Sequence, residues 1–186
     1  MANKQSSGLK VCVFCSANDL DEKYVKPAKE FASLLAKHGH TLVYGGSDKG
    51  LMKVMASGVQ EGGGRVFGVS VEYLRDSAKK DADEMLFAKD LGERKALMLE
   101  HSDVLVTLVG GIGTLDEVTE IIEHKQHGHH GKPIIILNID GFYEGLHQQL
   151  VRMEREGFFW HPLDEYVLFL NTPAEVIKYI DSLQKQ

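Results

Sequence analysis

Residues 104–117 read V-L-V-T-L-V-G-G-I-G-T-L-D-E and carry the strongest structural signal in this chain. The apolar run 104–108 predicts a buried strand, the glycines after it predict a tight turn, and a helical pattern follows. Glycines let the backbone approach a phosphate closely, and the free N–H groups and dipole at a helix start favour negative charge. The segment therefore predicts an anion site between a strand and a helix, with the carboxylate of Glu117 one turn into that helix.

Apolar runs and helical patterns alternate along the rest of the chain in the same way. Such alternation predicts a parallel sheet with helices on both faces, where ligands bind beyond the carboxyl ends of the strands. We expect a single-domain, Rossmann-like three-layer α/β sandwich with a mostly parallel sheet over residues 9–186, after a flexible N-terminus at residues 1–8. The expected strands are 10–15, 41–44, 65–71, 85–88, 104–108, 133–138 and 166–170. The expected helices are 22–38, 51–61, 93–101, 115–127, 142–156 and 173–183.

Two stretches have no clear periodic pattern. Residues 72–84 are charged and could form a loop, a short helix or a mobile flap. The aromatic residues Phe158, Phe159 and Trp160 are interpreted as core packing.

The composition is that of an ordinary soluble globular protein, with 43% hydrophobic and 26% charged residues among 186. The formal net charge of −6 gives no global positive field that would draw the chain to a nucleic acid polymer or to a membrane. Any anion site must therefore be built locally. Residues 1–8 lack the apolar core of a signal peptide, and no apolar run approaches the length of a membrane span, so a cytoplasmic protein is expected.

Cys12 and Cys15 form a C-x-x-C pattern that could indicate redox or metal chemistry. They lie inside an expected strand, however, and residues three apart on a strand point to opposite faces. The pattern therefore predicts two buried, reduced thiols.

A group of histidines invites a metal interpretation, with Glu120 as a further ligand. Its members fall at an expected helix end and in the loop after it: His124, His127, His129 and His130. No known metal-ligand spacing completes the set, so no native metal site is expected.

Three segments directly after expected strands are candidates for a ligand site: 16–18, 45–52 and 110–117. None has the G-x-G-x-x-G spacing of dinucleotide sites or the G-x-x-x-x-G-K-[ST] pattern of ATPases. The segments therefore favour a backbone-lined pocket for a single phosphate or sugar.

Glu117 has two interpretations that the local pattern leaves open. Residues 114–117 read T-x-x-E, a capping box in which Glu117 would accept the backbone N–H of Thr114. The alternative is a catalytic carboxylate beside the bound anion. Asp116 has a structural explanation, because acidic residues early in a helix suit its dipole.

Arg94 and Lys95 open a short expected helix, on which Arg94 and Met98 share one face. Taken alone, such a basic pair is usually a solvated surface. A functional interpretation of the pair depends on what the other motifs of the chain resemble.

These motifs together resemble the LOG ("Lonely guy") family of cytokinin-activating phosphoribohydrolases, which have also been labelled lysine decarboxylases. The family pattern P-G-G-x-G-T-x-x-E is met by Gly110, Gly111, Gly113, Thr114 and Glu117. The pattern R-K-x-x-M is met by Arg94, Lys95 and Met98. The pattern Y-G-G-G-x-x-G-L-M is met by Tyr44, Gly45, Gly46, Gly50, Leu51 and Met52. The likeness extends from about residue 11 to about residue 162, and the order and spacing of the motifs agree.

Several positions depart from the family patterns. Val109 replaces the motif proline, Ser47 and Lys53 replace glycines, and Gly92 stands where many members have histidine. The segment Ser16-Ala17-Asn18 differs from the usual Gly-Ser-Ser. Family members with such changes can keep the fold and the phosphate site while handling a different base.

The resemblance implies hydrolysis of the N-glycosidic bond of a nucleoside 5′-monophosphate, cytokinin riboside 5′-monophosphate or AMP-like, to a free base and ribose 5-phosphate. It makes Arg94 and Glu117 catalytic, and both are present. No metal or organic cofactor is required. The residues that it assigns to substrate and phosphate binding are Gly45, Gly46, Arg94, Lys95, Met98, Gly110, Gly111, Ile112, Gly113, Thr114, Leu115, Asp116 and Glu117.

Two rival functions remain from other classes. The substitutions at Val109 and Ser47 are compatible with a non-catalytic protein of the same fold that binds a nucleotide or a phosphorylated cofactor. The decarboxylase label would require a lysine that forms a Schiff base with pyridoxal phosphate, and no lysine lies in a recognisable context for one.

The resemblance also implies a homodimer with its active sites near the subunit boundary. Two neighbouring expected helices carry more apolar residues than one core-facing stripe needs: Ala96, Leu97 and Leu99, then Val118, Ile121 and Ile122. Such an excess suits a self-complementary two-fold patch, although burial within one chain would explain it equally well.

Overall fold

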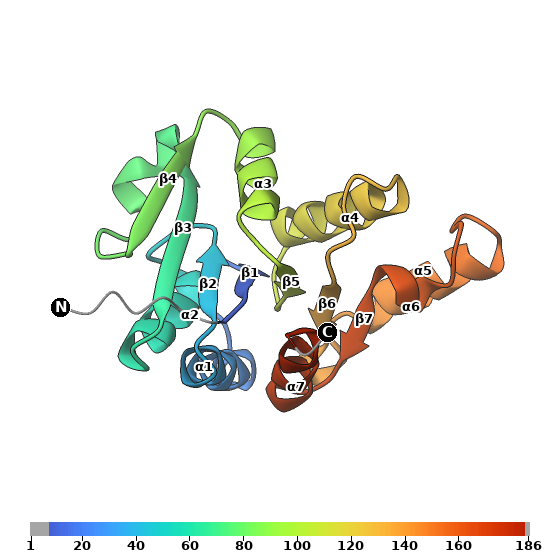
Figure 1. The fold of residues 1–186 in the computed structure, drawn as a ribbon, viewed down its shortest axis with the longest axis horizontal. Helices are drawn as coiled ribbons and strands as arrows, with labels where there is room; N and C mark the ends of the chain where they lie inside the picture. The colour runs from blue at the N-terminus through green and yellow to red at the C-terminus, as the bar shows by residue number, and fades with distance from the viewer. Residues whose placement is uncertain (1–7, 185–186) are drawn as a thin grey trace.

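Seven parallel strands form one sheet in the computed structural model, which describes residues 8–184 (Figure 1). The strand order across the sheet is β4-β3-β2-β1-β5-β6-β7. The strands are β1 (Lys10–Phe14), β2 (Thr41–Tyr44), β3 (Arg65–Val71), β4 (Glu84–Ala88), β5 (Val104–Thr107), β6 (Ile134–Leu137) and β7 (Leu168–Leu170). The chain builds outward from β1 to β4 and then returns to the other side of β1, so the strand order reverses between β1 and β5. Ligands bind at such a switch point in open parallel sheets.

Helices cover both faces of this sheet, as the alternating pattern predicts. The helices are α1 (Glu22–Lys37), α2 (Gly50–Glu61), α3 (Leu91–Glu100), α4 (Ile112–Gln126), α5 (Glu144–Arg155), α6 (Leu163–Tyr166) and α7 (Pro173–Leu183). Two 3-10 turns are η1 (Glu72–Ser77) and η2 (Ile139–Gly141). Every expected strand and helix is present with ends shifted by a few residues, and the three-layer α/β fold is confirmed. Helix α6 is not predicted by the sequence pattern, because one helical turn is too short to produce a periodic pattern.

Two apolar clusters make up the core, one on each face of the sheet. Residues of α1, α2 and α7 pack on one face, and residues of α3, α4, α5 and α6 pack on the other. In Figure 1, α1 and α7 lie below the sheet while α3 and α4 lie above it. Along β1 and just after it, Val13 and Cys15 face the first cluster, whereas Cys12 and Phe14 face the second. The two cysteines are therefore buried on opposite faces as free thiols, as predicted.

The segment 72–84, for which three conformations remained open, begins with the short helix η1. The residues after it pair with the loop that follows β2: Asp48 N–H donates to Ser77 O, and Lys79 N–H donates to Gly46 O. An antiparallel bridge joins Ser47 and Ala78 between these bonds. The segment thereby forms one wall beside the β2–α2 loop.

One packing expectation is wrong. Phe158 and Trp160 are each 62% exposed, and only Phe159 packs against the core cluster. The Trp160 ring instead lies edge-on against His127, at the end of α4, with 5.0 Å between the ring centroids. No local pattern predicts this contact, because the two rings lie 33 residues apart along the chain.

The expected flexible N-terminus falls on residues 1–8, of which all but Gly8 lie outside the described residues. Across residues 8–184, no helix combines the length and the apolar character that crossing a membrane requires.

Candidate active site

The three candidate segments after β1, β2 and β5 meet at the carboxyl edge of the sheet, as predicted. Ser16 joins the other two: its N–H donates to Val109 O at 3.2 Å, and its carbonyl accepts the Met52 N–H at 3.2 Å. Gly50 has a φ of +53°, and a Cβ there would lie 2.3 Å from the carbonyl oxygen of Asn18. A side chain at this position would therefore push the first two segments apart.

The glycine turn after β5 leads directly into α4. Gly111 is the N-cap residue and α4 begins at Ile112. A Cβ at Gly110 would lie 2.1 Å from Thr114 Oγ1, whereas Gly111 and Gly113 have no heavy atom within 4 Å of where a Cβ would stand. The turn is thus closed on the Thr114 side and open at Gly111 and Gly113. Because the first N–H groups of a helix have no partner within it, this open end can bind an anion.

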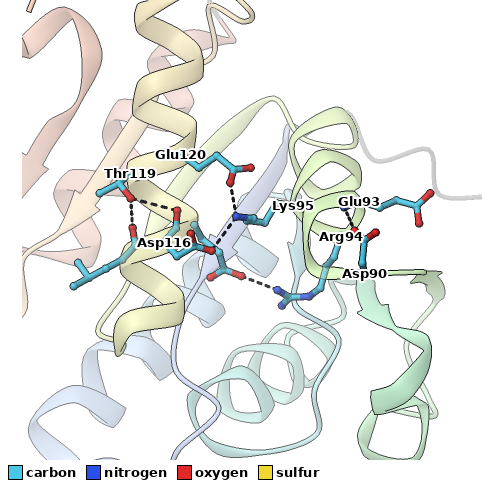
Figure 2. Close-up of polar contacts among 9 residues, drawn as sticks. Asp90, Glu93, Arg94, Lys95, Asp116, Thr119 and Glu120 are labelled. Atoms are coloured by element: carbon cyan, nitrogen blue, oxygen red, sulfur yellow. Dashed lines mark hydrogen bonds and ion pairs between the residues drawn. The ribbon is translucent and has the colours of Figure 1, made fainter.

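Arg94 and Glu117 form an ion pair beside this turn. Asp90 caps α3 by accepting the Glu93 N–H, which places Arg94 one turn into the helix (Figure 2). Arg94 Nη1 donates to Glu117 Oε1 at 2.8 Å, and Arg94 Nε donates to Val69 O at 3.0 Å. The two side chains are only 11% and 8% exposed. Arg94 is therefore not part of a solvated surface, although a basic pair taken alone favours that interpretation.

Gly45 makes room for the arginine of this pair. A Cβ at Gly45 would lie 2.0 Å from Arg94 Nη2, so the guanidinium passes over the bare backbone at the end of β2. Gly46 follows with a φ of +75°, a conformation that L side chains rarely adopt. Gly45 therefore contributes the space that a side chain would fill, and Gly46 contributes a backbone conformation that other residues rarely adopt.

The capping-box interpretation of Thr114 and Glu117 is wrong. Because α4 begins at Ile112, three residues earlier than expected, Thr114 lies within its first turn and is not the N-cap. The Glu117 carboxylate is therefore free to reach Arg94. Asp116 likewise lies beyond the first turn, so the helix dipole does not explain it, and it pairs with Lys95.

Burial controls the charge of Glu117. Burial raises the pKa of its carboxyl above the ordinary value of 4.5, and the neighbouring Arg94 opposes that rise. A carboxylate that is desolvated yet held beside a cation is well suited to stabilise positive charge developing on a bound molecule.

The remaining expected site residues lie around this centre in different ways. The Lys95 ammonium pairs with Asp116 at 2.9 Å and also with Glu120. Met98 is fully buried in the core below Arg94. Ile112 is 82% exposed, and Leu115 packs partly against the core.

A cavity of about 360 Å³ adjoins the glycine turn. Its lining includes Gly111, Ile112, Leu115, Phe142 and Leu146, so it is mainly apolar. Sequence reasoning missed the contribution of the segment before α5, because nothing local connects it with the turn. Tyr143, also in this lining, donates its hydroxyl hydrogen to Leu108 O at 2.8 Å and so fixes the end of the strand that precedes the glycines.

The departures from the family patterns fit this framework without distorting it. Val109 is buried, and its carbonyl accepts the bond from Ser16. Ser47 takes part in the bridge to Ala78. Lys53 and Gly92 are exposed.

Three histidines of the 124–130 region lie near one another, with the His129 ring centroid 5.4 Å from that of His124 and 6.2 Å from that of His127. His130 contacts the Ile121 carbonyl through Nε2 at 2.9 Å, and His127 packs against Trp160. Within residues 8–184, no group of three or more histidine, cysteine or acidic side chains is arranged to hold a metal ion.

A parallel sheet with a glycine turn that opens a helix at its switch point, and a buried Arg–Glu pair beside that turn, has the geometry of an α/β protein that can bind an anionic ligand at this edge. The family model described as "Possible lysine decarboxylase" matches residues 52–180. The chain belongs to this family, the LOG family, as its motifs indicate.

Two curated relatives come from Arabidopsis thaliana. The chain is 40% identical over 162 residues to the probable cytokinin riboside 5′-monophosphate phosphoribohydrolase LOG6, covering 85% of this chain and 81% of the relative. It is 33% identical over 181 residues to the cytokinin riboside 5′-monophosphate phosphoribohydrolase LOG3, covering 96% and 84%.

Solved structures share the fold at lower identity. The molybdenum cofactor carrier protein of Chlamydomonas reinhardtii aligns with a TM-score of 0.73 at 22% identity, covering 96% of this chain and 99% of that one. The molybdenum cofactor binding protein of Rippkaea orientalis aligns with a TM-score of 0.73 at 20% identity, covering 95% and 97%. At these identities the likeness shows the fold alone.

Proposed function

We propose that this protein is a phosphoribohydrolase that cleaves the N-glycosidic bond of a nucleoside 5′-monophosphate. The observation that carries the proposal is the buried Arg94–Glu117 pair beside an open helix start. The relatives named as phosphoribohydrolases, at up to 40% identity over most of the chain, support the same reaction.

The glycine turn is proposed to hold the 5′-phosphate. Its open positions Gly111 and Gly113 leave space for phosphate oxygens, and the N–H groups that begin α4 supply donors. Glu117 lies four residues beyond Gly113, about 6 Å farther along the helix axis at 1.5 Å per residue. A ribose bound through its phosphate at the turn would extend past this carboxylate.

Glu117 is proposed to stabilise the transition state. As the bond between the base and C1′ breaks, its electron pair leaves with the base and positive charge develops on the ribosyl carbon. The ionised carboxylate attracts that charge and orients a water molecule, whose oxygen bonds to C1′. The water proton compensates the departing base, so the products are the free base and ribose 5-phosphate. Binding energy from the remote phosphate holds the bond in place.

Arg94 is proposed to interact with the groups that carry negative charge during the reaction, the phosphate and the departing base. Its Nη2 lies over Gly45, facing the β2–α2 loop, while its other nitrogens are bonded to Glu117 and Val69. This guanidinium can bind a phosphate oxygen or assist the departing base. Neither role requires a metal or an organic cofactor.

A panel of nucleoside 5′-monophosphates tests the proposed function. We expect the purified protein to release free base from at least one of AMP, the cytokinin riboside monophosphates and other purine monophosphates, as measured by chromatography. The corresponding nucleosides, which lack the phosphate, should react far more slowly, because the glycine turn then contributes no binding energy. Tight binding without any base release would favour the rival, a nucleotide or phosphorylated-cofactor binding protein of the same fold.

We further propose that the protein is a homodimer. The expected apolar excess gives little support: Val118, Ile121 and Ile122 of α4 are buried within the chain, and Leu97 and Leu99 of α3 are half-buried against the core, which leaves only Ala96 exposed. Better support comes from a cavity of about 570 Å³ between α4 and α5, whose lining includes Met153 and the exposed Phe158. Light scattering coupled to size exclusion at micromolar concentration should give twice 20.7 kDa. A mass of 20.7 kDa that persists on concentration would contradict the dimer.

The cytoplasmic location expected from the sequence stays a prediction.

A further inference from the structure

Two adjacent sets of ion pairs connect helices α3 and α4. On α3, Arg94 reaches Glu117 of α4, while the next residue, Lys95, reaches Asp116 and Glu120 of α4. Figure 2 shows the Lys95 side chain extending between Asp116 and Glu120. Beside the Arg94–Glu117 contact, the ion pairs of Lys95 therefore form a second link between α3 and α4.

We infer that Lys95 is a positioning residue, which holds α3 against α4 and balances the charges of Asp116 and Glu120 so that Arg94 and an ionised Glu117 stay in contact. The inference rests on the proposed function, because it assigns Lys95 a part in the same reaction without a contact to the substrate.

The low exposure of the Lys95 side chain distinguishes this connection from an ordinary surface pair. The Lys95 side chain is 12% exposed, whereas those of Asp116 and Glu120 are 58% and 33% exposed. Burial lowers the pKa of Lys95, but the hydrogen bonds that its ammonium donates to Glu120 and Asp116 outweigh this effect, and the net pKa is raised. Lys95 is therefore charged at neutral pH, and a shielded cation between two helices restrains both of them.

The charges around Glu117 determine how readily its carboxyl ionises, so the charge of Lys95 affects the pKa of this group. Asp116 raises the pKa of the Glu117 carboxyl, while Arg94 and Lys95 lower it. The other titratable groups that interact with Glu117 are the thiols of Cys12 and Cys15 and the phenol of Tyr143. Burial raises the pKa of each of these three, so they are neutral at pH 7. Lys95 is thus one of two cations that favour the ionised form of Glu117.

The location of the Lys95 ammonium argues against the expected contact with phosphate. Its partners Asp116 and Glu120 are residues 5 and 9 of α4, which begins at Ile112. The open positions of the glycine turn, Gly111 and Gly113, are the N-cap and the second residue of that helix. The ammonium therefore lies beside later turns, with two carboxylates already bound.

The test compares four variants with the parent protein: Lys95→Met, Lys95→Arg, the double variant Lys95→Met/Glu120→Gln, and the control Lys125→Met. Lys125 lies on α4, the helix that carries Asp116 and Glu120, but its ammonium donates to Tyr166 O and contacts no carboxylate of the site. Removing Lys95 leaves Asp116 and Glu120 uncompensated, whereas the double variant removes one of these negative charges as well. Lys95→Arg keeps the cation.

In the base-release assay, we expect Lys95→Met to lower kcat about tenfold or more with a smaller change in KM, because displaced catalytic groups slow the chemical step. The acid limb of kcat/KM should move up by about one pH unit, since a nearby cation has been lost. Lys95→Arg should restore both, the double variant should restore the pH limb in part, and Lys125→Met should match the parent. If inorganic phosphate inhibits Lys95→Met more weakly than it inhibits the parent, while kcat is unchanged, Lys95 is a phosphate ligand and the inference is overturned.

A second measurement is independent of activity. The carboxyl ¹³C resonance of Glu117, assigned by its absence from Glu117→Gln, can be followed against pH in each variant. The midpoint should rise by about one pH unit in Lys95→Met and return part of the way in the double variant. An unchanged midpoint in Lys95→Met would refute the inference even if the parent hydrolyses nucleotides. If the parent releases no base from any nucleotide, the proposed function fails. The titration of Glu117 still tests whether Lys95 favours the ionised form of that carboxyl.

Discussion

Glu117→Gln is expected to abolish base release while leaving the fold intact. The substitution keeps the size of the side chain and removes the negative charge beside the proposed developing cation. Removing one preorganised electrostatic group typically costs about 10²–10³ in kcat, and we expect at least that loss here. Initial rates of base release with a saturating nucleoside 5′-monophosphate measure it. The control on the same helix, Glu123→Gln, alters an exposed carboxylate and should leave the rate unchanged.

The stability of Glu117→Gln follows from the pKa shift. Because burial raises the folded-state pKa of this carboxyl above 4.5, folding favours its protonated form. Its ionisation therefore weakens the fold as pH rises from the unfolded pKa through the folded one. Glutamine resembles the protonated form and still offers an oxygen to Arg94 Nη1, so the melting temperature at neutral pH should fall little or not at all. Turnover near that of the parent would refute the catalytic role, and a collapsed melting temperature would show a structural one.

The pH dependence of the parent gives the same prediction a second readout. Only the ionised carboxylate can stabilise a cation, so kcat/KM should decline on the acid side. Since the pKa of Glu117 is raised, the midpoint of that decline should lie above 4.5. Glu117→Gln should lose this limb together with its activity.

The fold was predictable because its signals are local. Most strands are short apolar runs, as in Ile134–Leu137, and the long helices repeat an apolar stripe, as in α1, so length and period together distinguish them. The start of α4 was mispredicted by three residues, because Gly111 caps it without a side chain that could serve as a signal.

The candidate site was predictable only in part. Residues after strands were expected to converge, and 16–18, 45–52 and 110–117 do so, since parallel strands end at one edge. The contact between Arg94 and Glu117 joins residues 23 apart, and no periodicity encodes such a distance. The role of Gly45 cannot be predicted from local sequence for the same reason, because it concerns the space that Arg94 occupies.

Arg94→Lys is expected to reduce kcat/KM on nucleotides about 100-fold, since small misplacements of catalytic groups have effects of that size. The guanidinium uses Nε for Val69 O and Nη1 for Glu117 while its Nη2 lies over Gly45. These three nitrogens lie in one plane, and a lysine ammonium offers a single nitrogen without that fork. Lysine can therefore keep the charge near Glu117 or approach the β2–α2 loop, but it cannot do both.

The control for this substitution is Arg65→Lys on β3, where the arginine pairs with Glu84 at the surface and is 49% exposed. Base release should be unchanged there, because a surface pair contributes little and a lysine can replace it. Activity of Arg94→Lys equal to that of the parent would reject a forked contact with the substrate. Arg94 would then act only as the counter-ion of Glu117, a role that needs one positive charge, and phosphate recognition would depend entirely on the backbone at the start of α4.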